Sequence, residues 1–246
     1  MITHTKYEEV KKDTFDFLIG IGVFLFYYLS QYFPDLPLKI LGINIMNLSY
    51  TFKTIYLIVY ELIILLIIAL IYKDTLIKSF KAFQKNKNKY FKKYFKYWFV
   101  IMIGMMISNF IIMCLNGGGI ANNEQGIRNI FDRNPLYVYI SGVMIAPILE
   151  ELVFRFNLRK IFKTDTLFII MSGVIFGCAH VIGQTETIID YLYIIPYSIP
   201  GFVFGYLFVK TNNIFTSMSM HIFHNGILIA LQFFTLFFGS IQWKKI

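Results

Sequence analysis

The sequence predicts an all-α protein, a polytopic membrane bundle of about seven transmembrane helices (six to eight). Three observations predict it. Of the 246 residues, 57% are hydrophobic and only 15% are charged, whereas soluble domains carry about 25% charged residues. The apolar residues form runs close to the 20 or so residues that a spanning helix needs. Basic residues gather between those runs, and the same composition excludes disordered, collagen-like and disulfide-stapled chains.

Seven apolar runs mark the expected spans in chain order. They are residues 14–32, 54–72, 98–115, 135–154, 167–183, 191–209 and 214–239. Lysines precede the first run and no small-residue cleavage site follows it, so we expect a retained span and not a cleaved signal peptide. Cys114 and Cys178 both lie inside apolar runs, which favours a role as small buried hydrophobic residues over a disulfide or a cysteine-based zinc site.

The connections between the runs predict the orientation. Residues 73–97 contain nine lysines and one aspartate, and residues 155–166 add four basic residues. Both connections share a side with the N-terminal lysines if the spans alternate, and the positive-inside rule places that side in the cytoplasm. Lys244 and Lys245 fit this scheme less well, because seven spans would leave them outside. The connections expected outside are 33–53, 116–134 and 184–190.

The basic connection 73–97 interleaves its lysines with aromatic residues. This composition also occurs in RNA-binding proteins, but directly between two spans it favours a helix on anionic lipid headgroups, where each lysine contributes about 1 kcal/mol. We therefore expect membrane lipid, and no nucleic acid, as a partner. We divide the chain into a three-span N-terminal region (1–134) and a four-span catalytic core (135–240). Gly117–Gly119, with the asparagines that follow, reads as a flexible external loop.

Five polar residues lie where lipid is expected. They are Glu150 and Glu151 at the end of the fourth run, His180 in the fifth, and His221 and Asn225 in the seventh. An acidic residue at the centre of a span costs about 2.5–3.5 kcal/mol, whereas a leucine returns only about 0.5 kcal/mol. A protein retains such groups when they are paired, line water or take part in chemistry.

The spacing of these residues predicts their relations. Glu151 and Arg155 are one helical turn apart and can form an ion pair. Glu150 points about 100° away, toward a different neighbour. His221 and Asn225 are also one turn apart on a common face.

Proline and glycine add two expectations. Pro147 should kink the fourth helix one turn before the glutamates. Two small-xxx-small pairs, Gly173 with Gly177 and Gly201 with Gly205, predict close packing of the fifth and sixth spans.

Two carboxylates and two imidazoles in a dry site favour hydrolysis of an acyl bond. A glutamate can deprotonate water as a general base. Glu150 or Glu151 with His180 and His221 could instead form a His₂Glu zinc set with one open position. Other intramembrane designs are absent from the sequence, which has no His-Glu-x-x-His, no Gly-x-Ser-x-Gly and no Gly-x-Gly-Asp.

Three segments resemble the motifs of the CPBP (Abi) family of intramembrane proteases, which includes the type II CAAX prenyl endopeptidases and bacteriocin-processing and immunity proteins. The segments are Glu150-Glu151-Leu-Val-Phe-Arg155, Phe176-Gly-Cys-Ala-His180 and His221-Ile-Phe-His-Asn225. The resemblance covers roughly residues 135–235. It implies a helical core with its site inside the membrane, in which Glu151 and Arg155 orient the catalytic cluster.

The resemblance also implies the remaining roles. Glu150 would activate water together with His180, while His221 and Asn225 would stabilise the tetrahedral oxyanion. It leaves open whether a divalent metal such as zinc, held by Glu150, His180 and His221, is required. On the span limits above, Glu150 and His180 differ in depth, so we predict that the fourth helix continues to about residue 162.

Our leading hypothesis is an intramembrane endopeptidase that cleaves a peptide or membrane-protein substrate, in bacterial peptide processing or bacteriocin self-immunity. One alternative is a non-proteolytic scaffold or immunity protein that binds a regulator or toxin. Another is a small transporter that uses Glu61 and Glu150 for proton coupling, although the sequence lacks the internal repeat expected of a transporter. Glu61, a lone acid in the second run, is expected to pair inside the bundle or meet a tyrosine.

Overall fold

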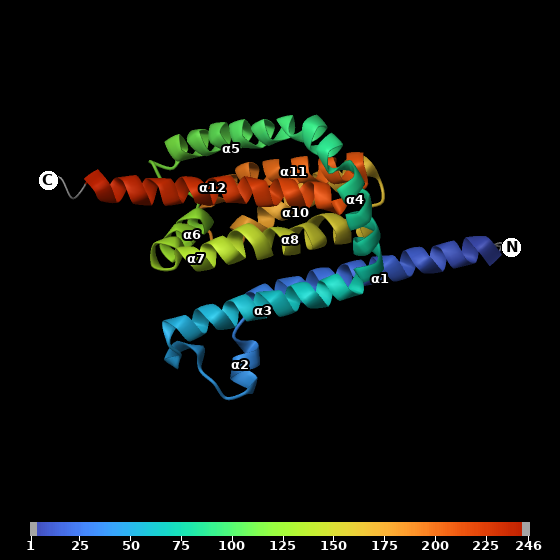
Figure 1. Cartoon of the computed structure of the whole chain (residues 1–246), viewed down its shortest axis with the longest axis horizontal. Helices are drawn as coiled ribbons and strands as arrows, with labels where there is room; N and C mark the ends of the chain where they lie inside the picture. The colour runs from blue at the N-terminus through green and yellow to red at the C-terminus, as the bar shows by residue number, and fades with distance from the viewer. Residues whose placement is uncertain (1–3, 243–246) are drawn as a thin grey trace.

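The computed structural model describes the backbone of residues 4–242 and the side chains of residues 13–235. This part of the chain is mostly helical and contains no strand (Figure 1). In chain order, the elements are α1 (His4–Tyr32), α2 (Leu36–Ile40), the 3₁₀ turn η1 (Ile45–Asn47), α3 (Tyr50–Ile71), α4 (Lys73–Tyr94), α5 (Lys96–Leu115), α6 (Asn122–Arg133), α7 (Pro135–Val138), the π-helix η2 (Tyr139–Ile145), α8 (Ala146–Glu151), the π-helix η3 (Leu152–Asn157), α9 (Leu158–Ile161), α10 (Asp165–Val181), the 3₁₀ turn η4 (Ile188–Tyr193), α11 (Ile194–Thr211) and α12 (Ile214–Gln242).

The predicted membrane bundle is confirmed. Among the described residues, six helices are long and apolar enough to span a membrane, and the fifth predicted span is the shorter apolar helix α10. Only 11% of the apolar windows in α3 and α5 is buried within the protein, against 56% in the Ile188–Thr211 span. The apolar surface of α3 and α5 therefore faces lipid, while α11 lies at the centre. The C-terminal Lys244 and Lys245 fall outside the described residues.

The fourth span is one long helix, Pro135–Ile161, with two π-helical stretches. The first, η2, ends just before Pro147, which lacks an amide hydrogen and clashes with the preceding turn, so the local ladder widens. The predicted disturbance at Pro147 is thus a π-helical insertion. The predicted extension to about residue 162 is confirmed, because α9 ends at Ile161.

Helices α10 and α11 pack closely at the predicted glycines. A Cβ added to Gly201 would lie 2.7 Å from the Cα of Gly173, and one added to Gly177 would lie 2.6 Å from the carbonyl oxygen of Ile194. Neither position can hold a larger residue without moving backbone, so the predicted close packing is confirmed.

Two connections are helical. The lysine-rich stretch forms α4, whose Phe80 and Phe83 rings lie 5.3 and 6.1 Å from Phe215 of α12. The prediction that Gly117–Gly119 and the asparagines after them form a flexible loop is wrong for the asparagines: Asn122 and Asn123 begin α6, whose Phe131 is buried. The residues after the glycine triplet form an amphipathic helix, in which Ile127 and Phe131 lie one turn apart among polar residues. The glycines directly before it made this pattern easy to overlook.

The helix ends separate into two groups (Figure 1). The start of α1, helix α4 and the end of α9 lie at one end of the bundle, which we call the basic end. Helices α2 and α6 lie at the opposite end. This matches the alternating arrangement that the sequence predicts for the basic connections.

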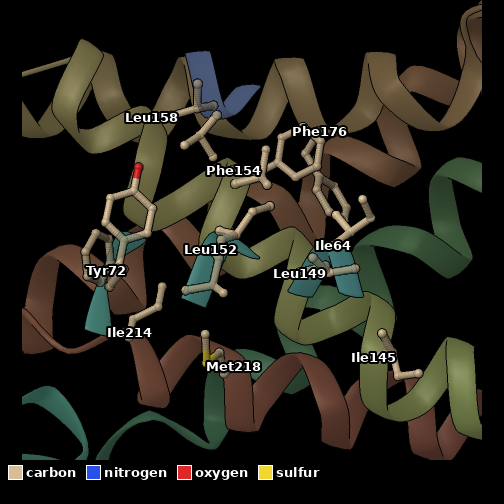
Figure 2. Packing of buried hydrophobic residues seen from close by; sticks show 14 of the residues in the cluster. Ile64, Tyr72, Ile145, Leu149, Leu152, Phe154, Leu158, Phe176, Ile214 and Met218 are labelled. Atoms are coloured by element: carbon tan, nitrogen blue, oxygen red, sulfur yellow. The ribbon is translucent and has the colours of Figure 1, made fainter. Parts of the chain in front are cut away.

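The main core lies where α3, α8–α9, α10 and α12 meet. Figure 2 shows Leu149, Leu152 and Phe154 of the fourth span between Phe176 on one side and Met218 on the other. These residues are at most 4% exposed, which fixes the helix that carries the two glutamates against the helices that carry the histidines.

Candidate functional site

The innermost part of the site is a buried ion pair. Arg155 Nε lies 3.4 Å from Glu151 Oε1, and both side chains are fully buried. The guanidinium carbon lies 4.4 Å from the ring centre of Phe176 and 5.3 Å from that of Phe204, and Nη2 donates to the carbonyl oxygen of Gly201 at 3.4 Å. The predicted pairing of Glu151 with Arg155 is therefore confirmed. An ion pair so enclosed holds the Glu151 carboxylate in one orientation.

His221 lies between the two glutamates. Its Nδ1 is 3.0 Å from Glu151 Oε1, and its Nε2 is 3.5 Å from Glu150 Oε2. Its ring stacks on Phe204 with centres 4.6 Å apart. The prediction that Glu150 faces a different neighbour from Glu151 is therefore wrong. The two side chains do diverge on their helix, but they reach opposite edges of one imidazole.

The π-helix η3, which follows the two glutamates, is hydrogen-bonded to the neighbouring helix α10. Ser172 of α10 donates to the carbonyl oxygen of Phe154 at 2.7 Å, inside the core. A π-helical stretch disturbs the ordinary backbone ladder, and a hydroxyl from a neighbouring helix can satisfy a carbonyl there. α10 is thereby joined by a hydrogen bond to the helix that follows the two glutamates.

His180 faces the site from the end of α10. Its Nδ1 lies 2.8 Å from the carbonyl oxygen of Phe176, and its ring stacks on Tyr197 at 5.0 Å. A carbonyl oxygen only accepts, so Nδ1 donates and Nε2 remains as an acceptor in the neutral ring. His180 and Glu150 line one cavity, as the predicted extension of the fourth helix requires.

Asn225 is less closely associated with the cluster. Its amide nitrogen donates to the carbonyl oxygen of Gly142 in η2 at 2.9 Å, and it is not among the residues that line the cavity. His224, on the same helix, is 3% exposed, and its Nδ1 has no hydrogen-bond partner in the described structure. The structure thus gathers Glu150, Glu151 and His221 with Arg155, adds His180 across the cavity, and leaves Asn225 one turn away.

The cavity has a volume of about 320 Å³. One side is formed by Glu150 and Phe154, another by His180 and the residues that follow it, and Asn123 contributes from α6. The remaining side comes from the last turns of α1, through Tyr27, Tyr28, Gln31 and Tyr32.

The contribution of α1 was missed by sequence reasoning. A weak signal exists, because Tyr27, Tyr28, Gln31 and Tyr32 place polar groups at one-turn spacing on a span. Tyrosine near the end of a span is also typical of the membrane interface, and the pattern alone does not separate the two roles.

Comparison with known proteins finds a family similar to the segment that carries this geometry. Residues 132–227 match the family model described as "Type II CAAX prenyl endopeptidase Rce1-like". We call this matched part of the chain the Rce1-like segment, after the family that it resembles. The family resemblance inferred from the three motifs is thereby confirmed, and the chain is a multi-pass membrane protein. The division of the chain at residue 134 stays a prediction.

Two curated relatives extend beyond the Rce1-like segment. The "Putative membrane peptidase YdiL" of Bacillus subtilis is 30% identical over 118 residues, which cover 46% of this chain and 43% of the relative. The "UPF0177 protein YvdC" of Lactococcus lactis is 24% identical over 136 residues, covering 54% and 50%. The chain therefore aligns with about half the length of these relatives. No solved structure matches the chain.

The donor set of the Rce1-like segment does not fit the zinc site considered above. Among the side chains that the structure describes, no three histidine, cysteine, aspartate or glutamate groups gather closely enough to hold a metal ion. Glu150 and His221 are adjacent, but both nitrogens of His221 face the two glutamates, and His180 contributes to the cavity from a separate helix. We therefore derive no step through a metal.

Glu61 lies outside the Rce1-like segment and contacts it. Tyr137 Oη donates to Oε1 of Glu61 at 3.0 Å, and Ser141 Oγ donates to Oε2 at 2.7 Å. The expectation that this acid meets a tyrosine is confirmed. Both carboxylate oxygens of Glu61 have partners, so this side chain joins α3 to the start of the fourth span by two hydrogen bonds.

Proposed function

We propose that the protein is an intramembrane endopeptidase in which Glu150 activates water. The observation that carries the proposal is the position of Glu150 on the wall of the cavity, 14% exposed, with His221 directly behind it. Similarity to an endopeptidase family and to a relative named as a membrane peptidase supports the same reaction class.

The charges of the cluster indicate where its protons lie. Glu151 and Arg155 neutralise one another, and the Nδ1 of His221 donates to Glu151. The other nitrogen faces the Glu150 carboxylate, so one proton shared between His221 Nε2 and Glu150 avoids repulsion between two acceptors. With that proton the four side chains carry no net charge, which limits the penalty of burying them.

The reaction then balances with residues of this chain. Glu150 takes a proton from a water molecule whose other contact is the Nε2 acceptor of His180, and the water oxygen bonds to the carbonyl carbon of the scissile peptide. The carbonyl electron pair moves to oxygen, and the positive charge of the protonated His221, which lies behind Glu150, stabilises that oxyanion electrostatically. The C–N bond breaks as the proton on Glu150 passes to the leaving amine.

Asn225 would assist this step less directly. The family resemblance assigns it to the oxyanion, but its amide nitrogen donates to Gly142 in this structure. We propose that it positions the α12 face that carries His221, and that any contact with the oxyanion follows release of that hydrogen bond.

The setting proposed is processing of a membrane-associated peptide, as in bacterial peptide maturation or bacteriocin self-immunity. The proposed orientation places the N-terminus and the lysines of α4 in the cytoplasm, because basic connections are retained there. The proposed partners are therefore a peptide substrate and anionic lipid headgroups against α4.

The test is a cleavage assay on protein purified in lipid nanodiscs, with a library of internally quenched peptides. We expect cleavage by the wild type and none by Glu150→Ala, His180→Ala or His221→Ala, each verified as folded by its thermal unfolding curve. Full activity in all three folded variants would overturn the enzyme proposal and favour a non-proteolytic scaffold.

A further inference from the structure

The two ends of α1 contact the rest of the bundle in different ways. At the basic end, Asp16 pairs with Lys160, and Asp13 pairs with Lys163 at 3.2 Å. The amide nitrogen of Asn157 donates to the carbonyl oxygen of Gly20 at 2.7 Å. Together, these contacts join α1 to α9 along about two turns at this end.

Packing between α1 and α9 at the basic end leaves no room for a substrate. A Cβ added to Gly20 would lie 2.9 Å from Cγ1 of Ile161. Tyr72 donates to the side-chain oxygen of Asn157 at 2.6 Å, and both side chains are buried. The basic end of the α1–α9 contact is therefore closed by ion pairs, a buried hydrogen-bond chain and close backbone packing.

At the opposite end, the same helix lines the cavity. The cavity side chains of α1 all come from its last two turns, Tyr27–Tyr32. The residues that reach furthest toward this end, including Gln31, Gly183 and Gln184, are exposed, whereas Glu150 lies deeper and is only 14% exposed. The cavity thus runs from exposed residues at the ends of α1 and α10 inward to the proposed general base.

The positions along the spans agree with this direction. Glu150 is followed by 11 residues of its span, the last of them Ile161, which is about 16 Å at 1.5 Å per residue. His180 is the residue before the end of α10 at Val181. Every basic residue of the fourth span lies on the far side of Glu150, from Arg155 to Lys160, and no lysine or arginine lines the cavity in the described residues.

We propose that substrate enters this cavity from the side of the membrane opposite the lysine-rich helix α4, between the end of α1 and the turn after α10. With α4 in the cytoplasm, the substrate is the extracytoplasmic, membrane-proximal segment of an exported peptide or membrane protein. The segment is neutral or basic near the scissile bond, because no lysine or arginine among the described residues lines the cavity to pair with an acidic segment, which would instead meet the Glu150 carboxyl group. This inference rests on the proposed peptidase function.

The entry side is tested by labelling intact cells with a membrane-impermeant maleimide. Gln184→Cys and Gln31→Cys report the cavity mouth, and Lys87→Cys on the exposed face of α4 is the matched control. All are made in a background with Cys114→Ser and Cys178→Ser. We expect labelling of Gln184→Cys and Gln31→Cys on intact cells, and of Lys87→Cys only after permeabilisation. The reverse pattern would overturn the entry side without bearing on whether the protein is a peptidase.

Use of the route is tested on the same labelled proteins after purification. A bulky maleimide at Gln184→Cys should reduce cleavage at least tenfold, while the same label at Lys87→Cys should leave it unchanged. Unchanged cleavage with the mouth fully labelled would overturn this route while the peptidase proposal survives.

Substrate charge is tested with peptide pairs that differ by Lys or Glu beside the scissile bond, and preference for the Glu member would overturn the substrate class. Absence of cleavage in the unlabelled proteins would instead count against the proposed function, and the labelling result would still decide which side the cavity faces.

Discussion

The protein holds acidic groups inside its spans in two places, and it holds them differently. At Glu61, each carboxylate oxygen accepts one hydroxyl hydrogen bond, from Tyr137 or Ser141. At the Glu150–Glu151 site, the partners are an imidazole and a guanidinium, and several atoms have no hydrogen-bond partner in the described structure, among them Oε2 of Glu151 and Nη1 of Arg155. A fully bonded acid stabilises a fold, whereas an incompletely bonded charged cluster beside a cavity is typical of a functional site.

The comparison also separates the roles of the two neighbouring glutamates. Glu151 is fully buried and joined to Arg155, whereas Glu150 reaches the cavity. Only the second can touch a reacting group. The variants below are ordered by the size of the effect expected, and each tests whether the two acidic regions differ as argued.

The largest effect is expected for Arg155→Met. Removing the guanidinium leaves the Glu151 carboxylate buried without its counter-charge, which should lower the free energy of unfolding by about 3–5 kcal/mol. Thermal unfolding in detergent, together with the amount of protein recovered from membranes, measures this.

The double variant Glu151→Gln/Arg155→Met serves as its control. It removes both charges, so it should recover part of the lost stability. A double variant no more stable than Arg155→Met would show that the guanidinium acts through its packing between Phe176 and Phe204 and not through its charge.

Glu150→Gln should abolish activity without unfolding the protein. The amide keeps the shape of the side chain but cannot take a proton from water, so we expect a fall in kcat of about 100-fold or more. Cleavage rates and an unchanged melting temperature check this together. Glu186→Gln is a suitable control, because Glu186 is an exposed acid that does not line the cavity. Normal turnover by Glu150→Gln would remove the distinction between the two acidic regions.

Gly201→Ala tests the packing that supports the cluster. Its new methyl group would lie 2.7 Å from the Cα of Gly173, where only backbone can move. We expect a loss of about 1–3 kcal/mol in stability from overpacking. Displacement of the Gly201 carbonyl would also disturb its contact with Arg155, so activity should fall too.

Gly22→Ala on α1 is the matched control for this glycine. No atom lies within 4 Å of the added carbon there, and alanine favours helix over glycine by about 1 kcal/mol. Equal losses of stability in the two variants would mean that the close approach of α10 and α11 is not what limits position 201.

Much of this site was visible in the sequence, for a physical reason. A polar residue in an apolar run costs free energy wherever its helix lies in the bundle. Glu150, His180 and His221 could therefore be identified from the sequence without a structure. The turn-by-turn spacing likewise predicted the pair of Glu151 with Arg155. These inferences needed no knowledge of how the helices pack.

The errors concern relations that only packing fixes. Convergence of both glutamates on one ring depends on where α12 places His221, and the spacing of 3.6 residues per turn carries no information on that. The π-helical stretches and the tyrosine wall from α1 depend on neighbours in the same way. Helix α6 was missed because the glycines before it dominated the local pattern.

The smallest effect is expected for Glu61→Gln. The amide oxygen still accepts one hydroxyl, and the amide NH₂ can donate to the other hydroxyl oxygen after that hydroxyl turns, so we expect a change of about 1 kcal/mol in unfolding free energy. Cleavage activity should be unaffected, because the hydrogen bonds of Glu61 go to Tyr137 and Ser141 of the fourth span and not to the Glu150–Glu151 cluster. Glu61→Leu should cost more stability than Glu61→Gln, since it leaves both hydroxyls without the acceptor. If Glu61→Gln lost activity while its melting temperature stayed at the wild-type value, a proton on Glu61 would matter to the reaction, and the transporter-like use of Glu61 and Glu150 together would replace the separation of a structural acid from a catalytic one.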